Sequence, residues 1–108
     1  MKILALEHEL PKATPAQFQQ YAIAEAHKVW ELHQAGIIRE LYFRADKNET
    51  VLILECASIN KVQEILAALP FVQARLISFE VIPLKAYSGF ERLFEKVELR
   101  TDQNHSLI

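Results

Sequence analysis

The sequence has only one cysteine, no apolar run long enough to cross a bilayer and no excess of basic residues. Cys56 lies in an apolar stretch with no second cysteine to pair with, which indicates a small core residue in a reducing compartment. The net charge of −2 provides no positive field for nucleic acid. The N-terminal “MKILALEHEL” is too short and too charged for a signal peptide or a membrane span, so we expect a cytoplasmic protein without membrane or nucleic-acid partners.

What the chain does contain is enough apolar material for one domain. Apolar residues make up 51% and charged residues 24% of its 108 residues, and a chain of this size can bury a core without a metal or a disulfide. Repeats, low-complexity runs and linkers are absent from the sequence. We therefore expect a single domain over residues 1–94, followed by a flexible C-terminal tail over residues 95–108.

The first third of the chain predicts a strand followed by a long helix. “KILALEHE” is apolar and of strand length, and it stops at “LPKATP”, a loop with two prolines. Thr14 stands where an N-cap is expected, with Pro15 at the first helical position and Gln17 where a capping box needs it. Apolar residues then recur every three or four positions until Gly36, which predicts a helix from Pro15 to Ala35.

The rest of the chain predicts a hairpin, a second helix and a fourth strand. “IIRELYFRA” and “TVLILECA” are joined by the polar turn “DKNE” and should pair antiparallel. Ser58 can cap an amphipathic helix that stops before Pro70, and “ARLISFEVIPL” follows as the last strand. “YSGFERLFEKVEL” predicts a short helix after the fold is complete.

This β-α-β-β-α-β order is typical of the ferredoxin-like α+β fold, with two helices on one face of a four-stranded antiparallel sheet. The strand over residues 50–57 is apolar at both parities, so the face without helices also needs a cover. No segment of the chain remains to supply one, which predicts a homodimer or a multiple of dimers, a dimeric α+β barrel. The aromatic segment 85–94 is expected to extend across that interface.

Several local patterns carry a resemblance to a known family. They are “LPKATPAQF” after the first strand, “EAHKVWELHQAG” at the end of the first helix, “LECASINKVQEILAALP” and the last-strand run “SFEVIPL”. The matching residues within them are Glu25, Glu31, Leu32, Gly36, Leu66, Leu69, Pro70, Glu80 and Val81. Together these patterns resemble the muconolactone isomerase-like group of dimeric α+β barrel proteins. The resemblance implies a cofactor-free, proton-moving isomerase fold that assembles from barrel dimers.

Three glutamates are candidate catalytic bases. Glu55 and Glu80 lie in strands that otherwise look buried, and Glu25 lies in the first helix. A carboxylate in a poorly hydrated space has a raised pKa and can move a proton at neutral pH, and two that converge inside the barrel would raise the pKa of at least one. Such chemistry also needs donors to hold an acidic substrate and its developing enolate. The candidate substrate-binding residues are Arg39, Arg44, Tyr42 and His8.

Structural roles for the same residues stay open. Glu55 and Glu80 can equally pair with arginines at strand ends as solvated edge residues. The histidines have no metal-ligand spacing, and His27 with Glu31 shares one helix face, so we expect no metal and no cofactor. The aromatic residues of the first helix are expected in the core or an interface, since no basic residues alternate with them. They are Phe18, Tyr21 and Trp30.

Two classes of function fit these residues. One is a small cofactor-independent isomerase moving a proton on a lactone or small hydrophobic acid; the other is a non-catalytic module that binds a small molecule or serves assembly. Cofactor-free oxygenation is a weaker third option by fold analogy. A pocket lined by Glu25, Glu55 or Glu80 together with a cationic or phenolic donor would favour the enzyme.

Overall fold

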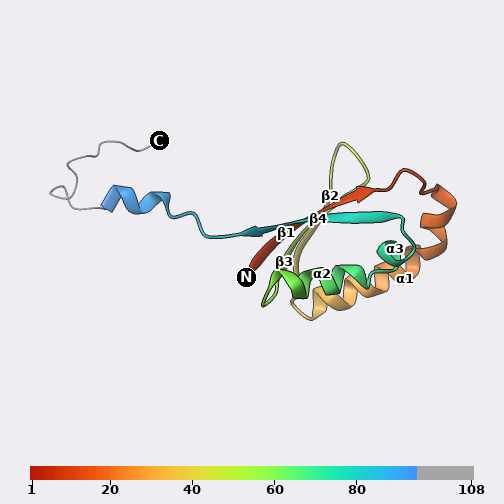
Figure 1. Cartoon of the computed structure of the whole chain (residues 1–108), viewed down its shortest axis with the longest axis horizontal. Helices are drawn as coiled ribbons and strands as arrows, with labels where there is room; N and C mark the ends of the chain where they lie inside the picture. The colour runs from red at the N-terminus through yellow and green to blue at the C-terminus, as the bar shows by residue number, and fades with distance from the viewer. Residues whose placement is uncertain (95–108) are drawn as a thin grey trace.

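The computed structural model describes residues 1–94, which form an antiparallel sheet covered on one face by helices (Figure 1). The strands are β1 (Lys2–Glu9), β2 (Ile38–Phe43), β3 (Thr50–Glu55) and β4 (Ile77–Leu84). The helices are α1 (Pro15–Gln34), α2 (Ile59–Ala67) and the single-turn α3 (Pro70–Gln73), and a 3-10 helix, η1, spans Gly89–Phe94. The predicted β-α-β-β-α-β order is confirmed, with α3 as an addition to it.

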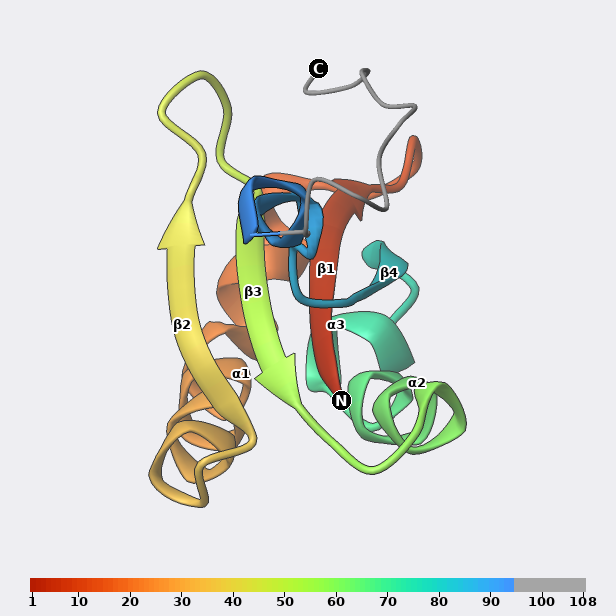
Figure 2. The ribbon, with the colours of Figure 1, turned by 90° about the vertical axis from the view of Figure 1, so that its left-hand side faces the viewer.

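The sheet has the strand order β2-β3-β1-β4, and all neighbouring strands are antiparallel. β1 lies inside the sheet between β3 and β4, while the hairpin partners β2 and β3 occupy one side (Figure 2). The predicted hairpin forms, with one irregularity between Ile38 and Glu40 where the register of β2 shifts. This arrangement is the ferredoxin-like fold that the sequence predicts.

The boundaries of α1 follow from its end signals. The Thr14 side chain accepts a hydrogen bond from the Gln17 backbone N–H, and the Gln17 side chain accepts one from the Thr14 N–H, which completes the capping box. Pro15 is the first helical residue, as predicted. Gly36 has a φ of 77°, the left-handed conformation that ends a helix at little steric cost. The helix therefore stops within one residue of the predicted end.

The short helix α3 was not anticipated from the sequence. Ser58 caps α2 through a hydrogen bond from the Lys61 N–H, but α2 ends at Ala67 and Pro70 then starts another helical turn. Proline suits that position because the first helical residue has no intrahelical N–H bond to lose. α3 presents the backbone N–H of Phe71 to α1, a contact that matters for the site described below.

The core lies between the sheet and the helices. β1 contributes Ile3 and Ala5, β3 contributes Leu52 and Leu54, and the other members come from α1, β2, α2 and the residue before α3. The remaining members of the cluster are Leu32, Ile38, Val62, Leu66 and Leu69. Cys56 is half-buried against this cluster, which is consistent with its expected structural role. Within residues 1–94, none of the helices is long and apolar enough to cross a membrane.

The sheet face away from the helices carries no element of the described chain. Its central residues are half-buried and apolar: Leu4, Leu6, Val51, Ile53 and Ile82. Beyond β4 the chain leads away from the body to η1, the last described element (Figure 1). η1 forms the first part of the helix predicted in this region, and the remainder, with the predicted tail over residues 95–108, lies outside the described residues. Tyr87, Phe90, Leu93 and Phe94 are all exposed in the single chain.

Candidate active site

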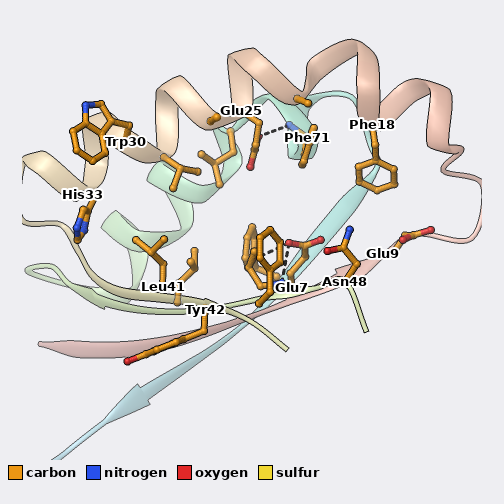
Figure 3. Close-up of a pocket in the computed structure, with 18 of the residues that line it drawn as sticks. Glu7, Glu9, Phe18, Glu25, Trp30, His33, Leu41, Tyr42, Asn48 and Phe71 are labelled. Carbon is orange, nitrogen blue, oxygen red and sulfur yellow. Dashed lines mark hydrogen bonds between the residues drawn. The ribbon is translucent and has the colours of Figure 1, made fainter. Parts of the chain in front are cut away.

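A cavity of about 990 Å³ separates α1 from the helix-covered face of the sheet. α1 and α3 form one wall, and β1, β2, β3 and β4 form the other (Figure 3). The walls are largely apolar and aromatic, with a few polar side chains among them, as expected for a small-molecule site. The large apolar lining residues are Phe18, Val29, Trp30, Leu41, Phe43, Leu52, Leu69, Phe71 and Phe79.

The cavity exists because the inner stripe of α1 is built from small residues at its middle. Ala22 and Ala26 line the cavity one turn apart, and neither side chain is long enough to reach the sheet. Leu32, near the end of α1, is the only buried residue of this 20-residue helix. At the other end, the rings of Phe18 and Phe71 pack edge to face with centroids 5.1 Å apart. α1 is thus anchored at both ends and leaves space beneath its centre.

Glu25 projects from α1 toward the cavity (Figure 3). One of its carboxylate oxygens, Oε1, accepts a hydrogen bond of 2.9 Å from the backbone N–H of Phe71. Burial raises the pKa of Glu25; the Phe71 N–H opposes this effect, and the negative charge of Glu7 adds to it. Glu25 is the one predicted catalytic residue that lines the cavity.

Glu7 faces the cavity from the opposite wall and was not among the predicted site residues. Its side chain is 8% exposed, and its Oε1 accepts hydrogen bonds from the Thr50 hydroxyl at 2.8 Å and the Thr50 N–H at 3.2 Å. Burial raises the pKa of Glu7, the two Thr50 bonds work against that, and the charges of Glu49 and Glu9 raise it further. Strand alternation could have found it, because Glu7 has the same parity as the core residues Ile3 and Ala5.

His33 and Trp30 complete the end of the cavity near the C-terminus of α1. His33 Nδ1 lies 2.8 Å from the carbonyl oxygen of Ile38, so Nδ1 donates a hydrogen bond to that oxygen. Trp30 was expected either in the core or in an interface. It is 57% exposed, so it is not a core residue of the single chain. The apolar stripe predicted for α1 is present, but its centre faces the cavity.

Glu55 and Glu80 lie on the other face of the sheet, away from the cavity. β-sheet register puts Glu55 opposite Lys2 and Glu80 opposite Leu6, which separates their Cα atoms by roughly 16 Å along and across the strands. The sequence left the register open; with this register the two carboxylates share the open face of the sheet but do not converge within a single chain. A hydrogen bond from the N-terminal amino group lowers the pKa of Glu55, where convergence would have raised one pKa. Glu80 lies 3.4 Å from the imidazole of His8.

The predicted substrate-binding residues also lie outside the cavity or point away from it. Tyr42 borders the cavity, but its ring points away (Figure 3) and its hydroxyl donates to Glu40 at 2.7 Å. Arg44 forms a two-point ion pair with Asp46 at 2.8 and 2.6 Å, and Arg39 donates to the Gly36 carbonyl. His8 shares the open face with Glu80. Within residues 1–94, no three histidine, cysteine, aspartate or glutamate side chains are arranged so that they could hold a metal ion.

The fold and this cavity define a class of small α+β proteins that place a site between a long helix and a ferredoxin-like sheet. A sequence model of the muconolactone delta-isomerase family matches residues 4–89, and the chain belongs to that family. No curated protein sequence is significantly similar to this chain.

Two solved structures share the fold. A muconolactone isomerase crystal structure is 21% identical, with a TM-score of 0.69 over 82% of this chain and 92% of that one. A 5-chloro-2-hydroxyhydroquinone dehydrochlorinase from Burkholderia phenoliruptrix, solved with 2,5-dihydroxybenzoquinone, is also 21% identical. Its TM-score is 0.63 over 81% of this chain and 96% of that one. At 21% identity, the similarity of this chain to these two structures shows a shared fold and no more.

Proposed function

We propose that this protein is a cofactor-independent isomerase that moves a proton on a small cyclic carbonyl compound in the cavity beneath α1. The observation that carries the proposal is the pair Glu7 and Glu25, which face one apolar-walled cavity from opposite sides. Burial raises the pKa of both carboxyl groups, and carboxyl groups with raised pKa values are suited to proton transfer near neutral pH. Family membership supports the same class of reaction.

The two carboxyl groups have different surroundings, which suggests different roles. Glu25 is held by the Phe71 N–H, which favours its charged form, and its second oxygen is available as a base for a proton next to the substrate carbonyl. Glu7 has two further carboxylates beside it, Glu9 and Glu49, and their charges favour its neutral form. In its protonated form, Glu7 can donate a hydrogen bond to the carbonyl oxygen as that oxygen becomes an enolate.

The net reaction is a proton shift within one substrate. Glu25 removes a proton from the carbon next to the carbonyl, and the electron pair moves onto the carbonyl oxygen under the Glu7 hydrogen bond. Return of the proton to another carbon of the conjugated system gives the isomer and restores both carboxyl groups. No oxidant, reductant or cofactor enters this sequence of steps.

Exchange of substrate hydrogen with solvent provides the test. The full chain is incubated in D2O with a panel of enol-lactones and cyclic enones, and deuterium incorporation is followed by proton NMR. We expect incorporation with the wild type and none above background with Glu25→Gln, which keeps the shape of the side chain but cannot act as a base. A wild type that binds panel members without exchange supports the alternative, a non-catalytic binding module.

We further propose a dimer formed through the open sheet face and segment 85–94. The apolar residues of that face and the exposed aromatic residues of η1 are two separate surfaces that a second copy can cover (Figure 1). In such a dimer, Glu55, Glu80 and His8 would lie at the interface. Sedimentation over a range of concentrations tests this; a single species at the chain mass of 12.4 kDa would contradict it. A cytoplasmic location remains part of the proposal, in keeping with the unpaired Cys56.

A further inference from the structure

Asn48 brings a side-chain amide from the loop between β2 and β3 to the wall of the cavity. Figure 3 shows this amide extending from the sheet side toward α1, on the wall that also carries Glu7 and Glu9. The amide forms no hydrogen bond with any residue that the structure describes. Because an amide has two N–H donors and an acceptor oxygen, Asn48 offers a ligand hydrogen bonds that the protein itself does not use.

The two residues that follow Asn48 are both fastened to β1. Glu49 accepts a hydrogen bond of 2.8 Å from the Glu9 backbone N–H through Oε2. Thr50 donates its hydroxyl to Glu7 at 2.8 Å. The backbone carbonyl of Glu49 also accepts an N–H from the other arm of the hairpin at 2.8 Å. Asn48 is therefore held next to the cavity by its neighbours in the sequence, although it lies in a loop.

Burial of the Glu49 side chain is costly and needs a reason. Glu49 is 8% exposed, and its Oε1 is buried without a hydrogen-bond partner in the described part of the chain. Lys47 Nζ lies 3.9 Å from that oxygen, which is beyond hydrogen-bond distance. A buried polar atom without a partner costs free energy, so such atoms are rare in native structures. The contact with the Glu9 N–H supplies a reason, because it fixes the loop directly beside Asn48.

Few other donors on the sheet wall are available to a ligand. The Thr50 hydroxyl is used by Glu7, and the Tyr42 hydroxyl donates to another glutamate and points away from the cavity. Among the described side chains of this wall, Asn48 is thus the donor that does not require a protonated carboxyl group.

We propose that Asn48 is a catalytic residue whose amide donates a hydrogen bond to the substrate carbonyl oxygen, and that Glu49 is the positioning residue that holds it there. The inference rests on the proposed function and adds a donor to it. As Glu25 removes the proton, the carbonyl oxygen gains negative charge, and a donor already in place stabilises that charge more than it stabilises the neutral carbonyl. Asn48 itself neither gains nor loses a proton, so it donates in the same way at every pH at which the protein is folded.

Kinetics of deuterium incorporation measure the contribution of Asn48. The full chain is compared with Asn48→Ala and Asn48→Asp at pH 7.5, on the panel compound that the wild type exchanges fastest. Loss of one donor to an oxyanion lowers kcat by about 100- to 1,000-fold in well-ordered sites, and we expect a loss of at least about tenfold here with a smaller change in KM. The control Asn60→Ala removes an exposed amide on α2 and should leave both constants unchanged. A kcat of Asn48→Ala equal to that of the wild type overturns the proposal.

Two variants of Glu49 test its positioning role. Glu49→Ala removes the acceptor of the Glu9 N–H and should lower kcat in the same direction as Asn48→Ala. Glu49→Gln keeps an oxygen that can accept this N–H, so it should restore most of the kcat lost in Glu49→Ala. In the Asn48→Ala background, Glu49→Ala should cause little further loss, because both changes remove the same donor. Full, independent losses in the double variant overturn the positioning role.

A binding measurement separates this inference from the proposed function. Cyclohexane-1,3-dione, which is an enolate at neutral pH, is titrated into 15N-labelled full chain at pH 7.5, with cyclohex-2-enone as its neutral counterpart. We expect the side-chain N–H2 signals of Asn48 to shift with the enolate, and Asn48→Ala to weaken enolate binding at least about fivefold more than enone binding. This result without any deuterium exchange would uphold the Asn48 donor and contradict the isomerase. Exchange by the wild type with unaffected Asn48 signals, or no enolate binding at millimolar concentration, overturns the inference.

Discussion

Replacing Thr50 by valine should destabilise the protein in a pH-dependent way. The Thr50 hydroxyl donates a hydrogen bond of 2.8 Å to Glu7, and valine has the same shape without the donor. A hydrogen bond to a charged group contributes about 1.5–3 kcal/mol and one between neutral groups about 0.5–1.5 kcal/mol. We expect the larger loss at pH values above the raised pKa of Glu7, where the group is ionised, and the smaller loss below it, where the group is protonated.

The sign follows from proton linkage. Loss of the donor raises the pKa of folded Glu7 further, so the folded variant binds more protons than the unfolded chain over a wider pH range. Its unfolding free energy therefore falls more than that of the wild type as pH rises through the folded pKa. Urea denaturation at several pH values measures this, with Thr50→Ser as the matched control that keeps the hydroxyl. A loss of equal size at pH 4 and pH 8, or the same loss in Thr50→Val and Thr50→Ser, would refute the reasoning.

Three further changes have defined outcomes. Glu25→Gln should abolish solvent exchange of the substrate and raise the unfolding free energy at pH 8. The wild-type protein loses stability as pH rises through the raised pKa of Glu25, and glutamine removes that loss. Urea titrations should show that the gain in unfolding free energy vanishes below about pH 4, under the ordinary glutamate pKa. Ile53→Lys places a charge at the centre of the open sheet face and should shift the sedimentation equilibrium from dimer to monomer, and an unchanged dimer would argue against that interface. Truncation after Lys85 should lower the melting temperature and weaken the dimer, whereas an identical melting curve would count against segment 85–94 as an interface element.

The elements of the fold were predictable because their signals are local. The capping box at Thr14 and the left-handed Gly36 fix the ends of α1 with little help from the rest of the chain. α3 was missed since Pro70 was interpreted only as a stop, although proline also suits the first position of a new helix. The local sequence permits Pro70 either to end α2 or to begin a new helical turn. The contact between α3 and α1 that accompanies the second arrangement exists only in the folded chain.

The site was only partly predictable because it depends on which face of the sheet the helices cover. β3 is apolar at both parities, so the sequence does not distinguish the core side, with Leu52 and Leu54, from the open side, with Glu55. Glu25 was found as a candidate base, whereas Glu7 was overlooked among the charged residues at the end of β1. Its parity with Ile3 and Ala5 was a usable signal, but the hydrogen bond from Thr50, 43 positions away, is a long-range contact that the sequence does not show.

Carbon-13 NMR titration of the glutamate side-chain carboxyl groups tests the acid–base pair most directly. Spectra of the full chain are recorded from pH 3 to pH 9, with the Glu7 and Glu25 signals assigned through the two glutamine variants. We predict that both carboxyl groups titrate above the ordinary glutamate value of 4.5, and that Glu7→Gln lowers the pKa of Glu25 by removing a nearby negative charge. Ordinary pKa values for both groups, with no response of Glu25 to Glu7→Gln, would contradict a shared proton-transfer site beneath α1.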